Sequence, residues 1–178
     1  LYGKRDLLEE MSPFLKGGDM NQAVYKDRYV LADLPWKFEA GTPNIEGAIG
    51  LGAAVDYLED IGMEDIEAHS RWLTEFALSE IEHIPGLEVY GPLDAKLRSA
   101  SISFNLNGLD AHGLAKMLSQ RYAIMVRSGY HCAQPLHHAL NLPKTVRASF
   151  YLYNTREEIS RLAAALKEIS KAYTRAVS

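Results

Sequence analysis

Hydrophobic residues recur at helical spacing in three long segments of the chain. The first segment spans residues 45–61 and also holds Gly47, Gly50 and Gly52, each of which weakens a helix by about 1 kcal/mol relative to Ala. A helix face made of glycines lets another backbone approach closely, so we expect tight packing there. The second segment spans residues 63–84 and should end at the Pro-Gly pair that follows it.

The third helical segment starts at Asn154 or Thr155 and continues to about residue 173. Glu158 lies three residues after Thr155, which is the spacing of a capping box, where two side chains satisfy the free N–H groups of a helix start. A shorter helix should begin after Asp110, because aspartate is a favourable N-cap residue.

Shorter segments between these helices have the pattern of strands. Residues 99–106 alternate apolar and polar side chains, which indicates a strand with one buried face. Further strands are predicted at residues 87–90, 123–126 and 145–151. Two long helices followed by a small sheet with interleaved helices predict an α+β fold.

The chain before residue 45 has little regular pattern. A short helix is predicted at residues 5–11, a turn at residues 16–19 and a strand somewhere within residues 24–31. The rest is punctuated by Pro and Gly and is long for a loop in a compact domain. Such segments are usually functional or lean on another part of the protein.

Composition and charge exclude several classes of protein. The chain has 178 residues, of which 47% are hydrophobic and 24% charged, as in ordinary globular domains. Its formal net charge of −4 disfavours binding to nucleic acid, which relies on basic patches. No apolar run is long enough to span a membrane. The single cysteine forbids a disulfide within the chain and indicates a reducing, cytoplasmic compartment.

The single cysteine, Cys132, lies in the densest polar stretch of the sequence. Arg127 and His131 are close to it in sequence, and such electropositive surroundings favour the reactive thiolate form. The alternative is that Cys132 is a small buried hydrophobic residue. A metal site built from the cysteine, His131, His137 and His138 fits none of the strong zinc spacings, and its alternative is a solvated loop with two surface histidines.

Two further residues could bind anions. Arg147 lies within an otherwise apolar strand, where its guanidinium either reaches solvent from a sheet edge or binds a carboxylate through two N–H groups. Thr42 follows a glycine just before the first long helix, a position that suits a phosphate group. The alternative for Thr42 is that it, or Asn44, simply caps that helix.

Three motifs occur in order along the chain: FEAGTPN at residues 38–44, RSGYHCAQP at 127–135 and VRASFYLYNT at 146–155. Together they resemble the C-terminal part of the group II, Suf-type cysteine desulfurases and selenocysteine lyases. These are pyridoxal-phosphate (PLP) enzymes of the class V aminotransferase group. The resemblance covers essentially the whole chain, and the three motifs with their spacings are highly specific in combination.

The resemblance implies a role for each matching residue. Cys132 matches the cysteine that attacks the substrate sulfur and becomes a persulfide, and Arg147 matches the arginine that holds the substrate carboxylate. Arg127 matches an arginine beside the catalytic cysteine, and Thr42 matches a threonine that reaches the cofactor phosphate of the other subunit of a homodimer. Tyr130 replaces the second histidine that is commoner in the family motif.

The resemblance also implies an architecture. The expected fold is the small C-terminal domain of a fold type I PLP-dependent transferase, with long helices packed on a small, mainly antiparallel sheet. Residues 1–44 would be a remnant of the large-domain edge with its connecting segment, and residues 45–178 the small domain with an interdomain helix. The family binds PLP through a lysine in a Ser-x-His-Lys segment, and this chain has no His-Lys pair. We therefore expect no covalently bound PLP and no activity in the chain alone.

The function implied is that of a cysteine desulfurase that forms L-alanine and passes sulfur to an acceptor protein, for iron–sulfur clusters or another sulfur-transfer pathway. One alternative is a selenocysteine lyase acting on L-selenocysteine, in which the cysteine matters less. The other is a stand-alone sulfur carrier or scaffold without cofactor chemistry of its own.

Overall fold

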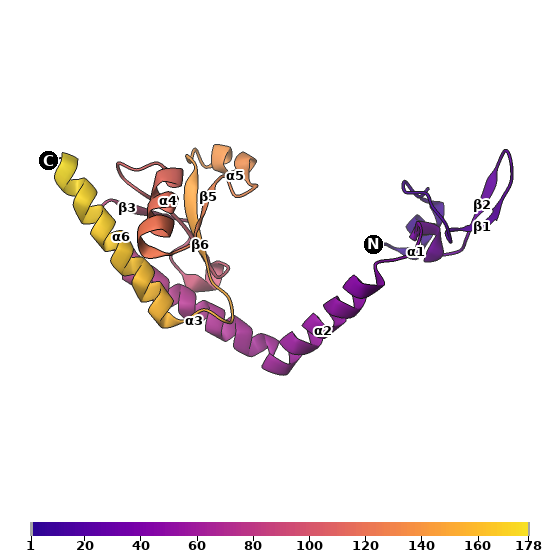
Figure 1. The fold of residues 1–178 in the computed structure, drawn as a ribbon, viewed down its shortest axis with the longest axis horizontal. Helices are drawn as coiled ribbons and strands as arrows, with labels where there is room; N and C mark the ends of the chain where they lie inside the picture. The colour runs from indigo at the N-terminus through magenta and orange to yellow at the C-terminus, as the bar shows by residue number, and fades with distance from the viewer. Residues whose placement is uncertain (1, 178) are drawn as a thin grey trace. The chain divides into compact units, whose positions relative to one another are not determined.

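The structure is a computed structural model that describes residues 2–177, with side chains described through residue 173. Leu1 and Ser178 lie outside the described residues. Contacts between Cα atoms divide the chain into two compact units, Leu1–Asp60 and Ile61–Ser178, which are described separately (Figure 1). The division after residue 44, inferred from the sequence, stays a prediction.

The first unit holds a short helix, a hairpin and a long helix. These are α1 (Arg5–Glu10), the antiparallel strands β1 (Asn21–Val24) and β2 (Tyr29–Leu31), the 3₁₀ turn η1 (Trp36–Phe38) and α2 (Ile45–Ile61), whose last residue falls in the second unit. The strand expected within residues 24–31 is thus a hairpin, closed where the Tyr25 N–H donates to the Arg28 carbonyl at 2.8 Å. No residue of α2 is buried among the described residues.

The second unit is an α+β domain around one four-stranded sheet. The strands β3 (Leu87–Tyr90), β4 (Ser101–Leu106), β6 (Thr145–Ser149) and β5 (Arg127–Gly129) lie in that spatial order, and each neighbouring pair is antiparallel. The helices are α3 (Met63–Ile81), α4 (Ala111–Tyr122), α5 (Gln134–Ala139) and α6 (Arg156–Val177), with a 3₁₀ turn η2 (Ala95–Leu97). The α+β fold predicted from the sequence is confirmed.

One face of this sheet forms the hydrophobic core. On β4, Ile102, Phe104 and Leu106 are buried, while the three residues alternating with them are only half-buried. Val146 and Ala148 of β6 are buried in the same cluster. Helices α3 and α6 pack along each other beside the sheet (Figure 1), and together with α4 they complete this core. The opposite face of the sheet is therefore left for polar side chains.

Side chains cap two helices of this domain as the sequence predicts. Asp110 accepts hydrogen bonds from the His112 and Gly113 N–H groups at the start of α4. At α6 the Thr155 N–H donates to the Glu158 carboxylate at 3.0 Å, and the Glu158 N–H donates to the Thr155 hydroxyl at 3.4 Å. This reciprocal pair is the predicted capping box.

The strands predicted at residues 99–106 and 145–151 are shorter in the structure, at Ser101–Leu106 and Thr145–Ser149. Two further predicted boundaries are wrong for identifiable reasons. Residues 123–126 form no strand, because Ala123 adopts a left-handed conformation (φ 54°) that ends α4 and the chain pairs with β6 only from Arg127. Helix α3 ends at Ile81 rather than residue 84, because the residue before Pro85 is disfavoured in helical conformation. No helix within residues 2–177 combines the length and apolar character needed to cross a bilayer.

Candidate active site

Two arginines face each other on the polar side of the sheet. Arg127 of β5 is the register partner of Arg147 of β6, and Ser103 of β4 is the partner of Arg147 on its other side. Residues directly opposite in an antiparallel pair project to the same face, so both guanidinium groups stand on the face away from the core. Like charges in this arrangement repel each other, and an anion placed between them would relieve that repulsion.

Arg147 lines an open cavity of about 720 Å³. Hydroxyl groups of Ser101, Ser149 and Tyr151 line the same cavity, and so do Glu64 and Glu67 from the start of α3. The Nε atom of Arg147 is buried and has no hydrogen-bond partner among the described residues. A guanidinium group at the wall of an open cavity has the donor geometry that binds a carboxylate.

Cys132 projects from a strained turn between β5 and α5. The Ala133 N–H donates to the Tyr130 carbonyl at 2.8 Å, which closes a four-residue turn. The two central residues, His131 and Cys132, have φ values of 55° and 62°. Left-handed conformations cost about 1–2 kcal/mol for each non-glycine residue, so the surrounding contacts must stabilise this turn.

The sulfur of Cys132 is exposed and touches one arginine. Cys132 is a free, exposed cysteine, so the alternative of a small buried hydrophobic residue is wrong. The Nη2 atom of Arg127 lies 3.0 Å from the Cys132 Sγ atom. A guanidinium N–H at this distance stabilises negative charge on sulfur, as a reactive thiol requires. The structure thus brings together Arg127, Cys132 and, through the β5–β6 register, Arg147.

The side chains of Thr145, His131 and His137 form a hydrogen-bonded cluster. The sequence did not predict this cluster. The Thr145 hydroxyl lies 2.8 Å from Nε2 of His131 and 3.2 Å from Nε2 of His137. Burial lowers the pKa of His131, and the positive charges of Arg147, His137 and Arg127 lower it further. Of the two histidines expected on the surface, only His138 is exposed, whereas His137 is buried.

Thr42 belongs to the first unit, in a bend just before α2. The side chain that caps α2 is Asn44, whose Oδ1 accepts from the Gly47 N–H at 2.9 Å. Thr42 is therefore not required as the cap, and its role toward a phosphate stays a prediction. Among residues 2–177, no three His, Cys, Asp or Glu side chains are grouped as a metal ion would require.

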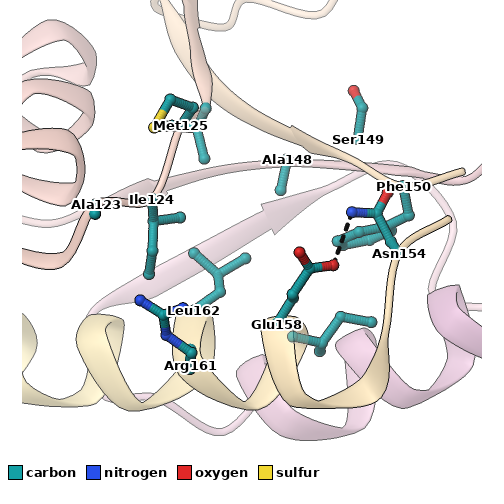
Figure 2. A pocket seen from close by; sticks show the side chains of 12 residues that line it. Ala123, Ile124, Met125, Ala148, Ser149, Phe150, Asn154, Glu158, Arg161 and Leu162 are labelled. Carbon is teal, nitrogen blue, oxygen red and sulfur yellow. Dashed lines mark hydrogen bonds between the residues drawn. The ribbon is translucent and has the colours of Figure 1, made fainter.

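A separate pocket of about 260 Å³ lies between residues 123–126 and the start of α6 (Figure 2). Its wall is mainly apolar. At its edge the Asn154 amide donates to Glu158 at 2.9 Å, and this bond, with the Thr155 N–H, holds the pKa of Glu158 below its usual range. None of the four predicted site residues is among the described residues that line it, so this pocket is separate from the candidate active site.

The family profile of the class-V aminotransferases matches residues 1–162 of the chain. The chain therefore belongs to this family, and the resemblance inferred from the three motifs is confirmed. It is 51% identical over 168 residues, 94% of its length, to a probable cysteine desulfurase of Halobacterium salinarum. The chain spans 40% of the length of that relative.

Solved cysteine desulfurases share the fold. The apo enzyme of Thermococcus onnurineus superimposes with a TM-score of 0.90 and 38% identity, over 96% of this chain and 42% of that one. The S-sulfonic acid form of CsdA from Escherichia coli gives a TM-score of 0.87 and 37% identity, over 97% and 42% of the two chains. The expected fold of the C-terminal part of such enzymes is thus confirmed.

Proposed function

We propose that the chain is the C-terminal part of a cysteine desulfurase in which Cys132 accepts sulfur from L-cysteine. The reaction is L-cysteine plus the Cys132 thiol giving L-alanine plus a Cys132 persulfide. The observation that carries this proposal is the 3.0 Å contact between Arg127 Nη2 and the exposed Cys132 sulfur, on a turn that follows directly from the strand facing Arg147.

Each of these residues has a defined task in the proposed reaction. Arg147 binds the substrate carboxylate and so orients the substrate. The Cys132 thiolate attacks the substrate sulfur, so that a sulfur–sulfur bond forms while the substrate carbon–sulfur bond breaks. The carbon that loses sulfur gains a proton, which yields L-alanine. Arg127 stabilises the thiolate before the attack.

Residues of this chain suit the phosphate of PLP and the carboxylate of a substrate, but the chain lacks the lysine segment to which the family attaches PLP. Arg147, with its unpaired Nε, is suited to the carboxylate of a substrate carried by PLP, and Thr42, which α2 does not need as a cap, is suited to the phosphate. The nine lysines include none that follows a histidine, so the family's lysine segment is not in this sequence. When bound, PLP supplies the electron sink for this chemistry. In our proposal Thr42 serves the PLP of a partner subunit in a homodimer.

A chimera tests the proposal directly. This chain would replace the matched C-terminal part of the Halobacterium salinarum relative, and the product would be incubated with L-cysteine. We expect alanine to form and the Cys132 peptide to gain the mass of one sulfur atom. Cys132→Ser should abolish both, whereas an exposed control, Ser160→Ala on α6, should leave both unchanged. A chimera that folds and makes no alanine would contradict the proposal.

The chimera tests the first alternative and the isolated chain tests the second. A selenocysteine lyase would release selenide from L-selenocysteine even as Cys132→Ser. A stand-alone sulfur carrier would load Cys132 of the isolated chain from a polysulfide and pass the sulfur to an acceptor protein. We propose a cytoplasmic desulfurase with such an acceptor, because the single exposed thiol requires a reducing compartment.

The isolated chain should not hold PLP covalently. After incubation with PLP and borohydride reduction, mass spectrometry should find no lysine carrying the cofactor above the level of a denatured control. The full chimera, which contains the relative's own N-terminal part, should be labelled at one lysine outside this chain. Specific labelling of one lysine within residues 1–178 would contradict this prediction.

A further inference from the structure

We propose that Thr145 is a positioning residue whose hydroxyl joins His137 to His131 in a directional hydrogen-bond relay, and that this relay holds the turn that presents Cys132. The proposal rests on the proposed function only in treating Cys132 as the reacting sulfur.

The direction of the relay follows from its anchored end. Nδ1 of His137 lies 3.1 Å from the Ala133 carbonyl, which can only accept a hydrogen bond, so Nδ1 carries the proton. In the neutral ring Nε2 is then an acceptor, and the Thr145 hydroxyl at 3.2 Å donates to it. The hydroxyl has a single proton, so its remaining contact, at 2.8 Å, is accepted from the Nε2–H of His131. His131 is thereby fixed with a proton on Nε2 and a bare Nδ1.

The relay is shielded from water and links separate elements. Thr145 is 1% exposed and His137 is 7% exposed, so water does not compete for the hydroxyl. Thr145 belongs to β6 and His137 to α5, while His131 lies in the turn after β5. One hydroxyl therefore ties the turn to both its flanking helix and the neighbouring strand. The Nδ1 atom of His131 is buried and has no partner among the described residues.

The relay explains how a strained turn keeps one geometry. His131 and Cys132 both have positive φ, a conformation that persists only where contacts fix it. The Thr145 hydroxyl is hydrogen-bonded to His131 directly, and His137 in turn is hydrogen-bonded to the Ala133 carbonyl at the end of the turn. The charged and titratable groups that act on His131 are Arg147 from β6, Arg127 from β5 and His137 from α5. The two arginines stay charged and disfavour a charged His131, so they favour the neutral ring that the relay requires.

The tautomer of His131 is the first test. Nitrogen NMR of the ring, on the intact chain, should show an unprotonated Nδ1 and a protonated Nε2 at neutral pH. A protonated Nδ1 on neutral His131 overturns the proposal. This measurement uses the wild-type chain and decides the matter even where a variant does not fold.

A double-mutant cycle is the second test. We expect Arg127→Ala to slow alkylation of Cys132 by iodoacetamide in the wild-type chain, and to have no further effect in Thr145→Val, because the turn no longer holds the sulfur at the guanidinium. Thr145→Ser keeps the hydroxyl and should keep the full Arg127 effect. Thr74→Val is the matched control, since Thr74 is also 1% exposed and its hydroxyl bonds the Ser70 carbonyl at 2.8 Å, within α3.

Any other outcome of the double-mutant cycle contradicts the proposed relay. An Arg127 effect that persists in Thr145→Val, or that is absent from the wild-type chain, overturns the proposal. Loss of that effect in Thr74→Val as well would show general destabilisation and overturn it too. Neither test requires sulfur transfer. A chimera that makes no alanine would therefore end the proposed function while leaving the relay intact, and a failed relay would leave the desulfurase proposal untouched.

Discussion

The Arg127–Arg147 pair shows how single residues prepare this site. Two guanidinium groups in register on neighbouring strands repel each other, and a folded sheet accepts that cost where an anion will separate the charges. One of the two already contacts the Cys132 sulfur, and the other has a buried, unpaired Nε beside an open cavity. In the proposed reaction Arg127 serves the thiolate of Cys132 and Arg147 serves the substrate carboxylate.

Removal of Arg127 should slow the reaction of Cys132 with alkylating agents. We expect Arg127→Ala to reduce the rate with iodoacetamide at neutral pH by about two- to fivefold, the scale of an exposed charge interaction. Arg121→Ala on α4 is the control, because this arginine is also exposed and does not contact the sulfur. Equal rates for wild type and Arg127→Ala would show that the contact does not influence the thiol.

The lowered pKa of His131 predicts a loss of stability in acid. Burial, then Arg147, His137 and Arg127, lower this pKa below the ordinary value of 6.5. Between the two values the unfolded chain binds a proton that the folded chain does not, so the free energy of unfolding falls as pH drops below about 6.5. It should fall less steeply in His131→Asn, because asparagine does not titrate. Asparagine is chosen because it tolerates the positive φ of this position. Urea unfolding at a series of pH values measures this.

The control for this pH dependence is His83→Asn, which removes an exposed histidine. The free energy of unfolding of His83→Asn should depend on pH as that of the wild-type chain does. If His131→Asn keeps the full wild-type slope below pH 6.5, then the slope has another origin and the assignment of a neutral His131 in the folded chain is wrong.

At the scale of elements, the sequence predicted the helices better than the strands that carry the site. Helix α2 and both caps follow from local chemistry, because spacing and capping act within a few residues. The apolar run at residues 123–126 instead holds side chains such as Ile124 and Val126 that pack on the core without ladder pairing. With the strand misplaced, the Arg127–Arg147 register could not be predicted.

The proposed hydrogen-bond relay that holds the Cys132 turn could not be predicted from local sequence patterns either. It needs two consecutive residues with positive φ and a threonine brought from a strand later in the chain. No spacing rule marks either feature. By contrast Cys132, Arg127 and Arg147 were predicted as site residues because their residue types carry the chemistry themselves, although their roles stay predictions.

The capping box of α6 should contribute measurably to stability. Thr155→Ala removes the hydroxyl that accepts from the Glu158 N–H, and loss of such a cap costs about 1 kcal/mol in the free energy of unfolding. Thr155→Ser keeps the hydroxyl and should lie close to wild type. Urea unfolding monitored by circular dichroism would measure both, and equal stability of the Ala and Ser variants would contradict the prediction.

At the scale of the whole molecule, helix α2 stands out because its apolar side chains are not buried among the described residues. Helix α2 buries none of its residues, and a Cβ added at Gly50 or Gly52 would meet nothing within 4 Å. The close backbone expected at this glycine face is thus not found among residues 2–177. The relatives are more than twice as long as the matched part, so a further segment of such a protein is available to cover this face.

The exposed surface of the first unit predicts how the isolated chain behaves. Several aromatic side chains of residues 12–44 are largely exposed, namely Phe14, Tyr25, Tyr29 and Trp36. Apolar patches beyond a few hundred Å² are uncommon on stable monomers, so the chain should self-associate through this surface or exchange its amide protons rapidly there. Residues 63–173 have a buried core of their own and should be protected.

Light scattering and hydrogen exchange on the same sample test this directly. Association should rise with concentration and fall in the double variant Phe14→Ser, Trp36→Ser, which makes the exposed surface polar. Protection of residues 63–173 should be the same in both proteins, because neither residue belongs to the core of the second unit. A wild-type monomer at high concentration with strong protection throughout residues 12–44 would mean that the first unit is self-sufficient, and the proposal that another part of a desulfurase covers it would fail.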